Sequence, residues 1–149
     1  MFIPTDLCRD SYGNIWIGTV GNGLLRYDPQ KGSIVHMHGL PCTDISAIRE
    51  DRQGNIWVSS QYGMASYDYT SDSFKSYFKA DGIGGNQFYD RSACILSDGT
   101  LAFGGTHGVT IFNPIDVKKP YEAPLRFDEL TIHNRPVCAA TESDVISRS

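Results

Sequence analysis

Residues able to perform acid–base or metal chemistry are few and scattered in this sequence. His36 and His38 lie two residues apart, so in a strand they would share one face and could supply half of a metal site. No carboxylate lies beside them, and an exposed strand face is the favoured interpretation. The adjacent carboxylates of Glu50 and Asp51 would point to opposite faces of a strand, which does not suit paired acid–base work. The sequence therefore predicts no catalytic residue, no metal site and no cofactor.

The four cysteines do not form a recognisable motif. They are separated by 34, 52 and 44 residues, at Cys8, Cys42, Cys94 and Cys138, and no Cys-x-x-Cys occurs. Four cysteines allow three disulfide pairings, between which the sequence does not choose. We expect mostly buried free thiols, because an unpaired cysteine behaves as a small hydrophobic residue.

A group of polar and aromatic residues could instead bind a ligand without catalysis. Their side chains are amphipathic or planar, which is the chemistry that carbohydrate contacts use, and we expect them in loops. They are Tyr62, Asn86, Gln87, Tyr89 and Arg91. The alternative interpretation is that they are ordinary loop residues.

Composition limits the elements that could position these residues. The chain has 149 residues, of which 13 are Lys or Arg and 17 are Asp or Glu, so the net charge is −4. This mild acidity argues against a nucleic-acid surface, and the 15 glycines with 40% hydrophobic content argue against disorder or a coiled coil. The longest apolar runs have four residues, so no membrane-spanning helix is expected, and residues 1–6 do not resemble a signal peptide.

The chain repeats itself with a period of 40 to 45 residues. Residues 10–19 recur as 51–60, residues 23–28 recur as 63–68, and a degraded third copy covers 98–114. The repeated positions that we assign to structural roles are Gly13, Asn14, Trp16, Gly54, Asn55, Trp57, Gly99 and Phe103. We expect both tryptophans to pack in the core. The third copy carries Ala102 at the tryptophan position, so it is expected to be an atypical, terminal copy.

Each copy reads as about four short β-prone segments, including residues 14–19, 24–27, 33–38, 45–50, 55–60, 73–78 and 93–96. A four-stranded repeat of this length is typical of a β-propeller blade. Consecutive apolar residues around Trp16 fit a strand covered on both faces, as in a blade between two others. We therefore predict an all-β fold of about three four-stranded β-propeller blades, which is a partial propeller.

The expected domains follow from the repeats. Residues 1–117 form the partial propeller, with copies near 1–40, 41–83 and 84–117, and residues 118–124 form a linker rich in proline and lysine. Residues 125–149 would begin a second domain. Three blades do not close a ring, so we expect the open blade flanks to drive formation of a homo-oligomer.

The motif Asp10 to Asp28 resembles the two-component regulator propeller repeat, and Asp51 to Asp68 is similar, with Ser59 and Ser60 replacing Gly and Thr. Residues 82–114 resemble the last blade of such sensors. Residues 124–137 resemble the opening of the immunoglobulin-like three-tyrosine domain that follows it. The fold would then be a partial propeller followed by the first strands of an immunoglobulin-like domain.

The resemblance implies a non-catalytic, periplasmic sensor segment of a hybrid two-component histidine kinase. It also implies an oligosaccharide as the ligand of the parent protein, with no nucleic-acid partner and no membrane contact by this segment. Two other functions remain open. One is a fragment of a propeller glycan hydrolase or lyase, and the other is a protein-interaction propeller.

Overall fold

A computed structural model describes residues 2–117, 131–132 and 135–136. The chain divides into two units, residues 1–118 and 119–149. The described part of the second unit is a two-stranded antiparallel sheet of β12 (Thr131–Ile132) and β13 (Arg135–Pro136). The rest of the predicted immunoglobulin-like start lies outside the described residues, so that assignment stays a prediction.

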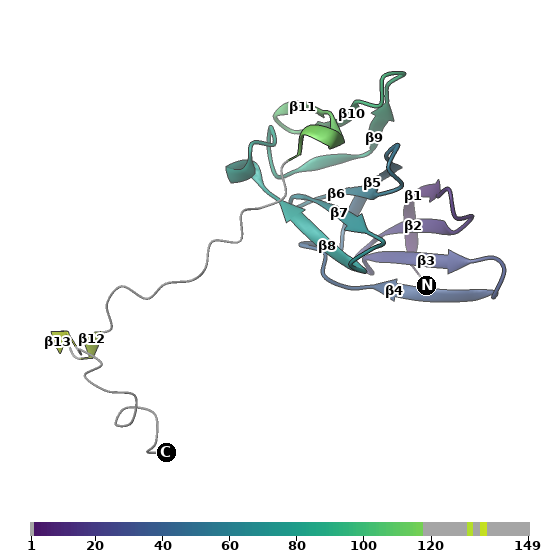
Figure 1. The fold of residues 1–149 in the computed structure, drawn as a ribbon, viewed down its shortest axis with the longest axis horizontal. Coiled ribbons are helices and arrows are strands. Elements are labelled where there is room, and N and C mark those ends of the chain that lie inside the picture. Colours follow the sequence, from purple (N-terminus) through teal and green to yellow (C-terminus); the bar gives the residue numbers. More distant parts are fainter. Residues whose placement is uncertain (1, 118–130, 133–134, 137–149) are drawn as a thin grey trace, which may run out of the picture. The chain divides into compact units, whose positions relative to one another are not determined.

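The first unit is built from three antiparallel sheets (Figure 1). Sheet 1 contains β1 (Ile3–Arg9), β2 (Ile15–Val20), β3 (Leu24–Asp28) and β4 (Ser33–Met37). Sheet 2 contains β5 (Ile45–Glu50), β6 (Ile56–Ser60), β7 (Met64–Asp68) and β8 (Ser73–Tyr77). Sheet 3 contains β9 (Phe88–Ile95), β10 (Leu101–Gly105) and β11 (Gly108–Phe112).

Two short 3-10 helices, η1 (Lys79–Asp81) and η2 (Pro114–Asp116), complete the described elements. None of the described residues forms a helix long and apolar enough to cross a membrane.

The all-β prediction is confirmed, with one difference in the third sheet. Sheets 1 and 2 have four strands in sequential order, whereas sheet 3 has three strands within the described residues. Residues 118–130 lie outside the described residues, and among the described strands β11 pairs only with β10.

Equivalent turns give the sheets their common form. Gly13, Gly54 and Gly99 occupy the same place in the turn between the first two strands of each sheet, with φ of 90°, 84° and 95°. Only glycine adopts this left-handed backbone without strain, so the repeated glycine fixes where each first strand reverses.

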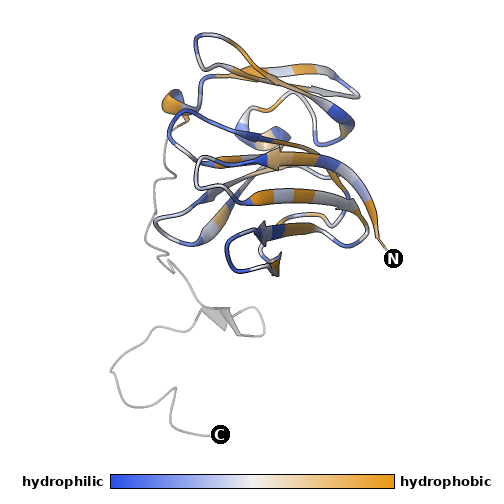
Figure 2. Cartoon of the chain, turned by 90° about the vertical axis from the view of Figure 1, so that its right-hand side faces the viewer, coloured by the Kyte–Doolittle hydropathy of each residue, from blue (hydrophilic) through white to orange (hydrophobic). Residues whose placement is uncertain are grey.

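The sheets pack face to face in chain order, and their first strands β1, β5 and β9 lie next to one another. Trp16 of sheet 1 packs into a core with residues of sheet 2 such as Ile48 and Val58. Trp57 of sheet 2 packs equivalently on Leu101 and Phe103 of sheet 3. In Figure 2 the hydrophobic residues gather along the strands while many connecting turns are hydrophilic. This stacking of sheets through their faces is blade packing.

Candidate functional site

The repeated aspartate and tryptophan form a structural hub in sheets 1 and 2. The indole Nε1 of Trp16 donates a hydrogen bond of 2.8 Å to the carboxylate of Asp10, and Trp57 does the same to Asp51 at 2.8 Å. Asn14 and Asn55 each donate to the same carboxylates through the backbone N–H and the side-chain amide. In each of the first two copies, the repeated asparagine and tryptophan thus meet around one buried aspartate carboxylate.

Sequence reasoning missed this use of the aspartates. The signal was available, because each aspartate lies six residues before its tryptophan. In the third copy, backbone hydrogen bonds place Leu96 and Thr100 where Asp10 and Asn14 lie in the first. Leu96 and Ala102 therefore replace the acceptor and the donor together. Phe103, beside Ala102, is buried against sheet 2.

Three of the five predicted ligand residues line one pocket. This cavity, called the Tyr62 pocket below, has a volume of about 320 Å³ and is lined by Gln61, Tyr62, Lys79, Gly85, Asn86, Gln87 and His107. The lining comes from three places: the β6–β7 loop, the segment between β8 and β9, and the β10–β11 loop. Tyr62 is 56% exposed, so its ring is available to a ligand.

Hydrogen bonds hold the walls of the Tyr62 pocket together. The backbone carbonyl of Asn86 accepts from Gly63 N–H at 2.6 Å, and its side-chain oxygen accepts from Lys79 N–H at 2.7 Å. Gln61 donates from Nε2 to the carbonyl of Phe88 at 3.0 Å. The loop between sheets 2 and 3 is therefore anchored at both ends, while the side-chain amide nitrogen of Asn86 has no acceptor among the described residues.

Tyr89 and Arg91 lie elsewhere, in strand β9 rather than in the expected loop. Strand β9 begins at Phe88 and not near residue 93, because Phe88 still pairs with Gly105 of β10. Residues 89–92 lie in a shift of register between this pair and the pair of Ala93 with Phe103. Arg91 adopts a φ of 57°, a strained left-handed backbone for a residue with a side chain. Tyr89 is 58% exposed and does not line the Tyr62 pocket.

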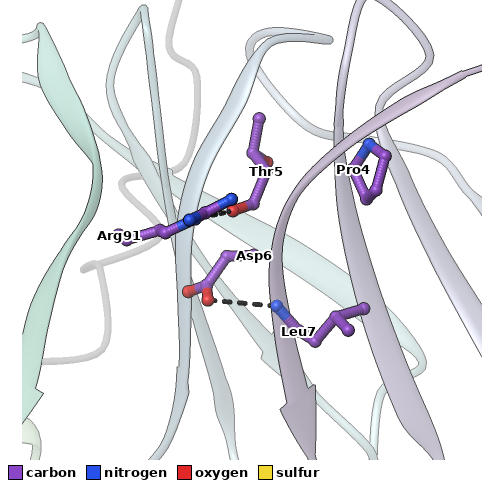
Figure 3. A pocket seen from close by; sticks show the side chains of 5 residues that line it. All are labelled: Pro4, Thr5, Asp6, Leu7 and Arg91. Atoms are coloured by element: carbon purple, nitrogen blue, oxygen red, sulfur yellow. Dashed lines mark hydrogen bonds between the residues drawn. The ribbon is translucent and has the colours of Figure 1, made fainter.

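Arg91 belongs to a second pocket of about 270 Å³, together with Pro4, Thr5, Asp6 and Leu7 of β1. Figure 3 shows its guanidinium turned toward β1, where Nε donates to the carbonyl of Thr5 at 2.8 Å. Asp6 in the same pocket is already paired with Arg49, whose guanidinium nitrogen lies 2.8 Å from the carboxylate. Arg91 therefore links sheet 3 to sheet 1 and does not share a pocket with the other four predicted ligand residues.

His36 and His38 line a third pocket of about 270 Å³ with Cys42. Within the described part of the chain, no three His, Cys, Asp or Glu side chains lie close enough to hold a metal ion. Cys8, Cys42 and Cys94 are free thiols, but Cys8 and Cys42 are only half-buried and Cys94 is exposed, so the expected burial is wrong for these three. Cys138 lies outside the described residues. Burial raises the pKa of the Cys8 thiol, because the ionised form loses solvation between the sheets.

The sequence repeats match a known family. Residues 1–21 and 39–62 correspond to the family described as two component regulator propeller, and these segments contain Trp16 and Trp57 with their aspartates. These two segments, one from each of the first two copies, are therefore similar to two-component regulator propeller repeats. The propeller part of the predicted resemblance is thereby confirmed. The resemblance of residues 124–137 to the three-tyrosine domain stays a prediction.

Larger proteins contain segments similar to these propeller repeats. Histidine kinase P4 of Formosa agariphila is 27% identical over 120 residues, which is 80% of this chain and 9% of that protein. The extracellular domain of BT3049, assigned as a hybrid two component system of B. thetaiotaomicron, matches with a TM-score of 0.72 and 26% identity. That match covers 91% of this chain and 20% of the solved one.

A second solved structure supports the fold alone. The extracellular domain of BT4673 from B. thetaiotaomicron, also assigned as a hybrid two component system, has a TM-score of 0.61 at 22% identity. The match covers 78% of this chain and 19% of the solved chain. The chain with the propeller repeats thus spans a fifth or less of the length of these relatives.

Proposed function

We propose that residues 1–117 are part of the propeller sensor region of a hybrid two-component signalling protein, where they help to bind or relay a carbohydrate signal without catalysing a reaction. The observation that carries this proposal is the match to the extracellular domain of BT3049 over 91% of the chain. Because the BT3049 structure is that of an extracellular domain, we propose that this segment lies in the periplasm of a bacterium.

The chemistry of the Tyr62 pocket supports a carbohydrate ligand. An exposed aromatic ring offers an apolar face for the C–H side of a sugar ring, and planar amides pair with hydroxyl groups in two directions. The Tyr62 pocket combines the Tyr62 ring with the amides of Asn86 and Gln87, within a backbone frame fixed by hydrogen bonds. Loops held in this way by a rigid scaffold are where binding residues commonly lie.

A signal from the bound ligand would leave the propeller unit through the segment that follows sheet 3. Asn113 caps η2 by accepting a hydrogen bond from Ile115 N–H at 3.2 Å, so the start of η2 is fixed to the end of sheet 3. A ligand that bridges the β6–β7 and β10–β11 loops would tighten sheet 3 on sheet 2. We propose that this tightening is the event passed to the following domain.

Isothermal titration calorimetry of the full chain with a panel of oligosaccharides tests this function. Tyr62→Ala should weaken binding of the active sugar about tenfold, since stacking on an aromatic ring contributes on the order of 1 kcal/mol or more. Tyr89→Ala is the matched control, because Tyr89 is equally exposed but lies outside the Tyr62 pocket. Loss of affinity in the Tyr89 variant alone, or no binding by any sugar, would contradict the proposal.

A further inference from the structure

The Tyr62 pocket is lined by a positively charged side chain, which binding of a neutral sugar does not require. Its nitrogen-bearing basic lining residues are Lys79 and His107, and no Asp or Glu contributes to the lining. Lys79 is exposed at the start of η1 and makes no ion pair within the described residues. In a chain with a net charge of −4, this cation without a partner gives the pocket the opposite sign to the protein as a whole.

The imidazole of His107, the second basic group of the pocket, is held in place by contacts with neighbouring residues. The imidazole of His107 lies against Gly85, where an added Cβ would come within 2.9 Å of Nδ1. Nδ1 also lies 2.9 Å from the hydroxyl of Thr106, and Thr106 N–H donates to the carbonyl of Gln87 at 3.0 Å. These contacts engage Nδ1 and leave Nε2 as the ring nitrogen able to hydrogen-bond a ligand.

The two groups come from different segments that meet at this pocket. Lys79 belongs to η1, which follows β8 of sheet 2, and His107 belongs to the β10–β11 turn of sheet 3. A neutral sugar would leave the ammonium group without a specific partner. A ligand with a negatively charged substituent would instead accept charge-assisted hydrogen bonds, which are about twice as strong as neutral ones.

We propose that the Tyr62 pocket binds a saccharide with an anionic substituent, a carboxylate or a sulfate, with Lys79 contacting the anionic group and Tyr62 packing on the sugar ring. This inference rests on the proposed carbohydrate-binding function and narrows its ligand class. His107 Nε2 and the free amide nitrogen of Asn86 complete the set of groups that face the ligand.

The test compares charged and neutral forms of the same sugar on the full chain by calorimetry. Tetragalacturonate and its fully methyl-esterified form test the carboxylate, and a sulfated galacto-oligosaccharide with its desulfated form tests the sulfate. Lys79→Gln should reduce affinity for the charged member of the active pair about tenfold, as expected for loss of a hydrogen bond to a charged group. Lys31→Gln is the control, since it removes the same charge outside the Tyr62 pocket.

The results separate this inference from the function on which it rests. Tighter binding of one charged form, weakened by Lys79→Gln and by salt but not by Lys31→Gln, supports the anionic class. Equal binding of charged and neutral forms with no effect of Lys79→Gln overturns it and leaves carbohydrate binding standing. Equal competition by inorganic sulfate alone also overturns it, because the site would then recognise no sugar. Binding of no sugar defeats both.

Discussion

At the scale of single residues, the carboxylate of Asp10 carries more hydrogen bonds than its place in a turn suggests. It accepts from Asn14 and Trp16 of its own sheet and from the hydroxyl of Tyr69, which reaches over from sheet 2. A buried carboxylate is tolerated only when such donors replace its water. Sheet 3 lacks both the aspartate and the tryptophan, which is consistent with their acting as one unit.

Replacing this carboxylate should destabilise the fold. Asp10→Asn leaves one acceptor oxygen for several buried donors and brings a second N–H group against the indole N–H of Trp16. We expect a loss of about 2–3 kcal/mol in the free energy of unfolding, measured by urea denaturation. Asp98→Asn is the control, because the exposed Asp98 accepts from Thr100 N–H in its turn, which asparagine can also do. Equal effects of the two substitutions would refute the hub.

The same carboxylate predicts how stability depends on pH. Burial raises the pKa of Asp10, but the hydrogen bonds from Tyr69, Asn14 and Trp16 outweigh it and lower the pKa below its usual value. The ionised carboxylate is then favoured in the folded state, so its stabilisation is present above the unfolded pKa of about 4 and is lost as pH falls through the lower folded pKa. The difference in unfolding free energy between the wild type and Asp10→Asn should therefore shrink between pH 5 and pH 2. A constant difference over that range, which spans about 3 pH units, would contradict this assignment.

At this scale, the sequence predicts contacts between residues that are close in sequence better than contacts between residues from distant segments. Trp16 and Trp57 repeat visibly, and their expected burial in the core agrees with their positions between the sheets. The sequence could predict Tyr62, Asn86 and Gln87 as candidate ligand residues but not that they line one pocket. That pocket depends on three segments that blade packing brings together. The contact of Tyr69 with Asp10 spans 59 residues, and no equivalent contact to Asp51 occurs among the described residues.

At the scale of strands, the distance between neighbouring sheets depends on one repeated position in the second strand. This position is Gly18 in β2 and Ser59 in β6, which pair with equivalent residues of the neighbouring strands. A Cβ at Gly18 would lie 2.7 Å from Cγ2 of Ile45 in sheet 2. Nearby, the hydroxyl of Thr5 donates to the carbonyl of Ile45 at 2.6 Å, so sheet 1 is held closely against β5.

Substitutions to alanine at these equivalent positions should have opposite signs. Gly18→Ala forces β2 away from Ile45 and should cost about 1–3 kcal/mol, the usual range for overpacking. Ser59→Ala removes a buried hydroxyl that has no hydrogen-bond partner among the described residues, and it should stabilise by about 1 kcal/mol. Thermal and urea unfolding of both variants give the comparison. A stabilised Gly18→Ala or a strongly destabilised Ser59→Ala would show that the sheets are not spaced in this way.

The strands themselves were largely predictable, and their irregularities were not. The apolar segments around Trp16 and Trp57 form β2 and β6 close to the expected ends. Strand β1 was hard to recognise because Pro4 interrupts its pattern and the ladder slips by one residue at Thr5. The register between β9 and β10 shifts by more than one residue at 89–92, and β9 continues through this shift. Tyr89 and Arg91 therefore lie in a strand and not in the expected loop. A slip in register depends on the partner strand, so one segment alone does not reveal it.

At the scale of the whole propeller unit, the outward faces of the end sheets are apolar. On sheet 3, alternate residues of β10 and β11 such as Phe103 and Phe112 face sheet 2, so Val109 and Ile111 face away and are 60% and 64% exposed. On sheet 1, the face opposite Trp16 carries Leu7 and Ile34, which are also exposed. Two such faces are suited to packing against another sheet, as sheet 2 does on both of its sides.

We therefore expect the isolated chain to self-associate through these faces. Size-exclusion chromatography with light scattering should show dimers or larger species whose fraction rises with concentration. Ile111→Glu should shift the chain toward the monomer, because a buried glutamate would lose its solvation at the contact. Ile115→Glu is the matched control, since Ile115 is also exposed but lies in η2 and not on a sheet face. A monomer at every concentration, or equal effects of the two substitutions, would mean that the exposed faces of sheets 1 and 3 do not mediate association in this chain.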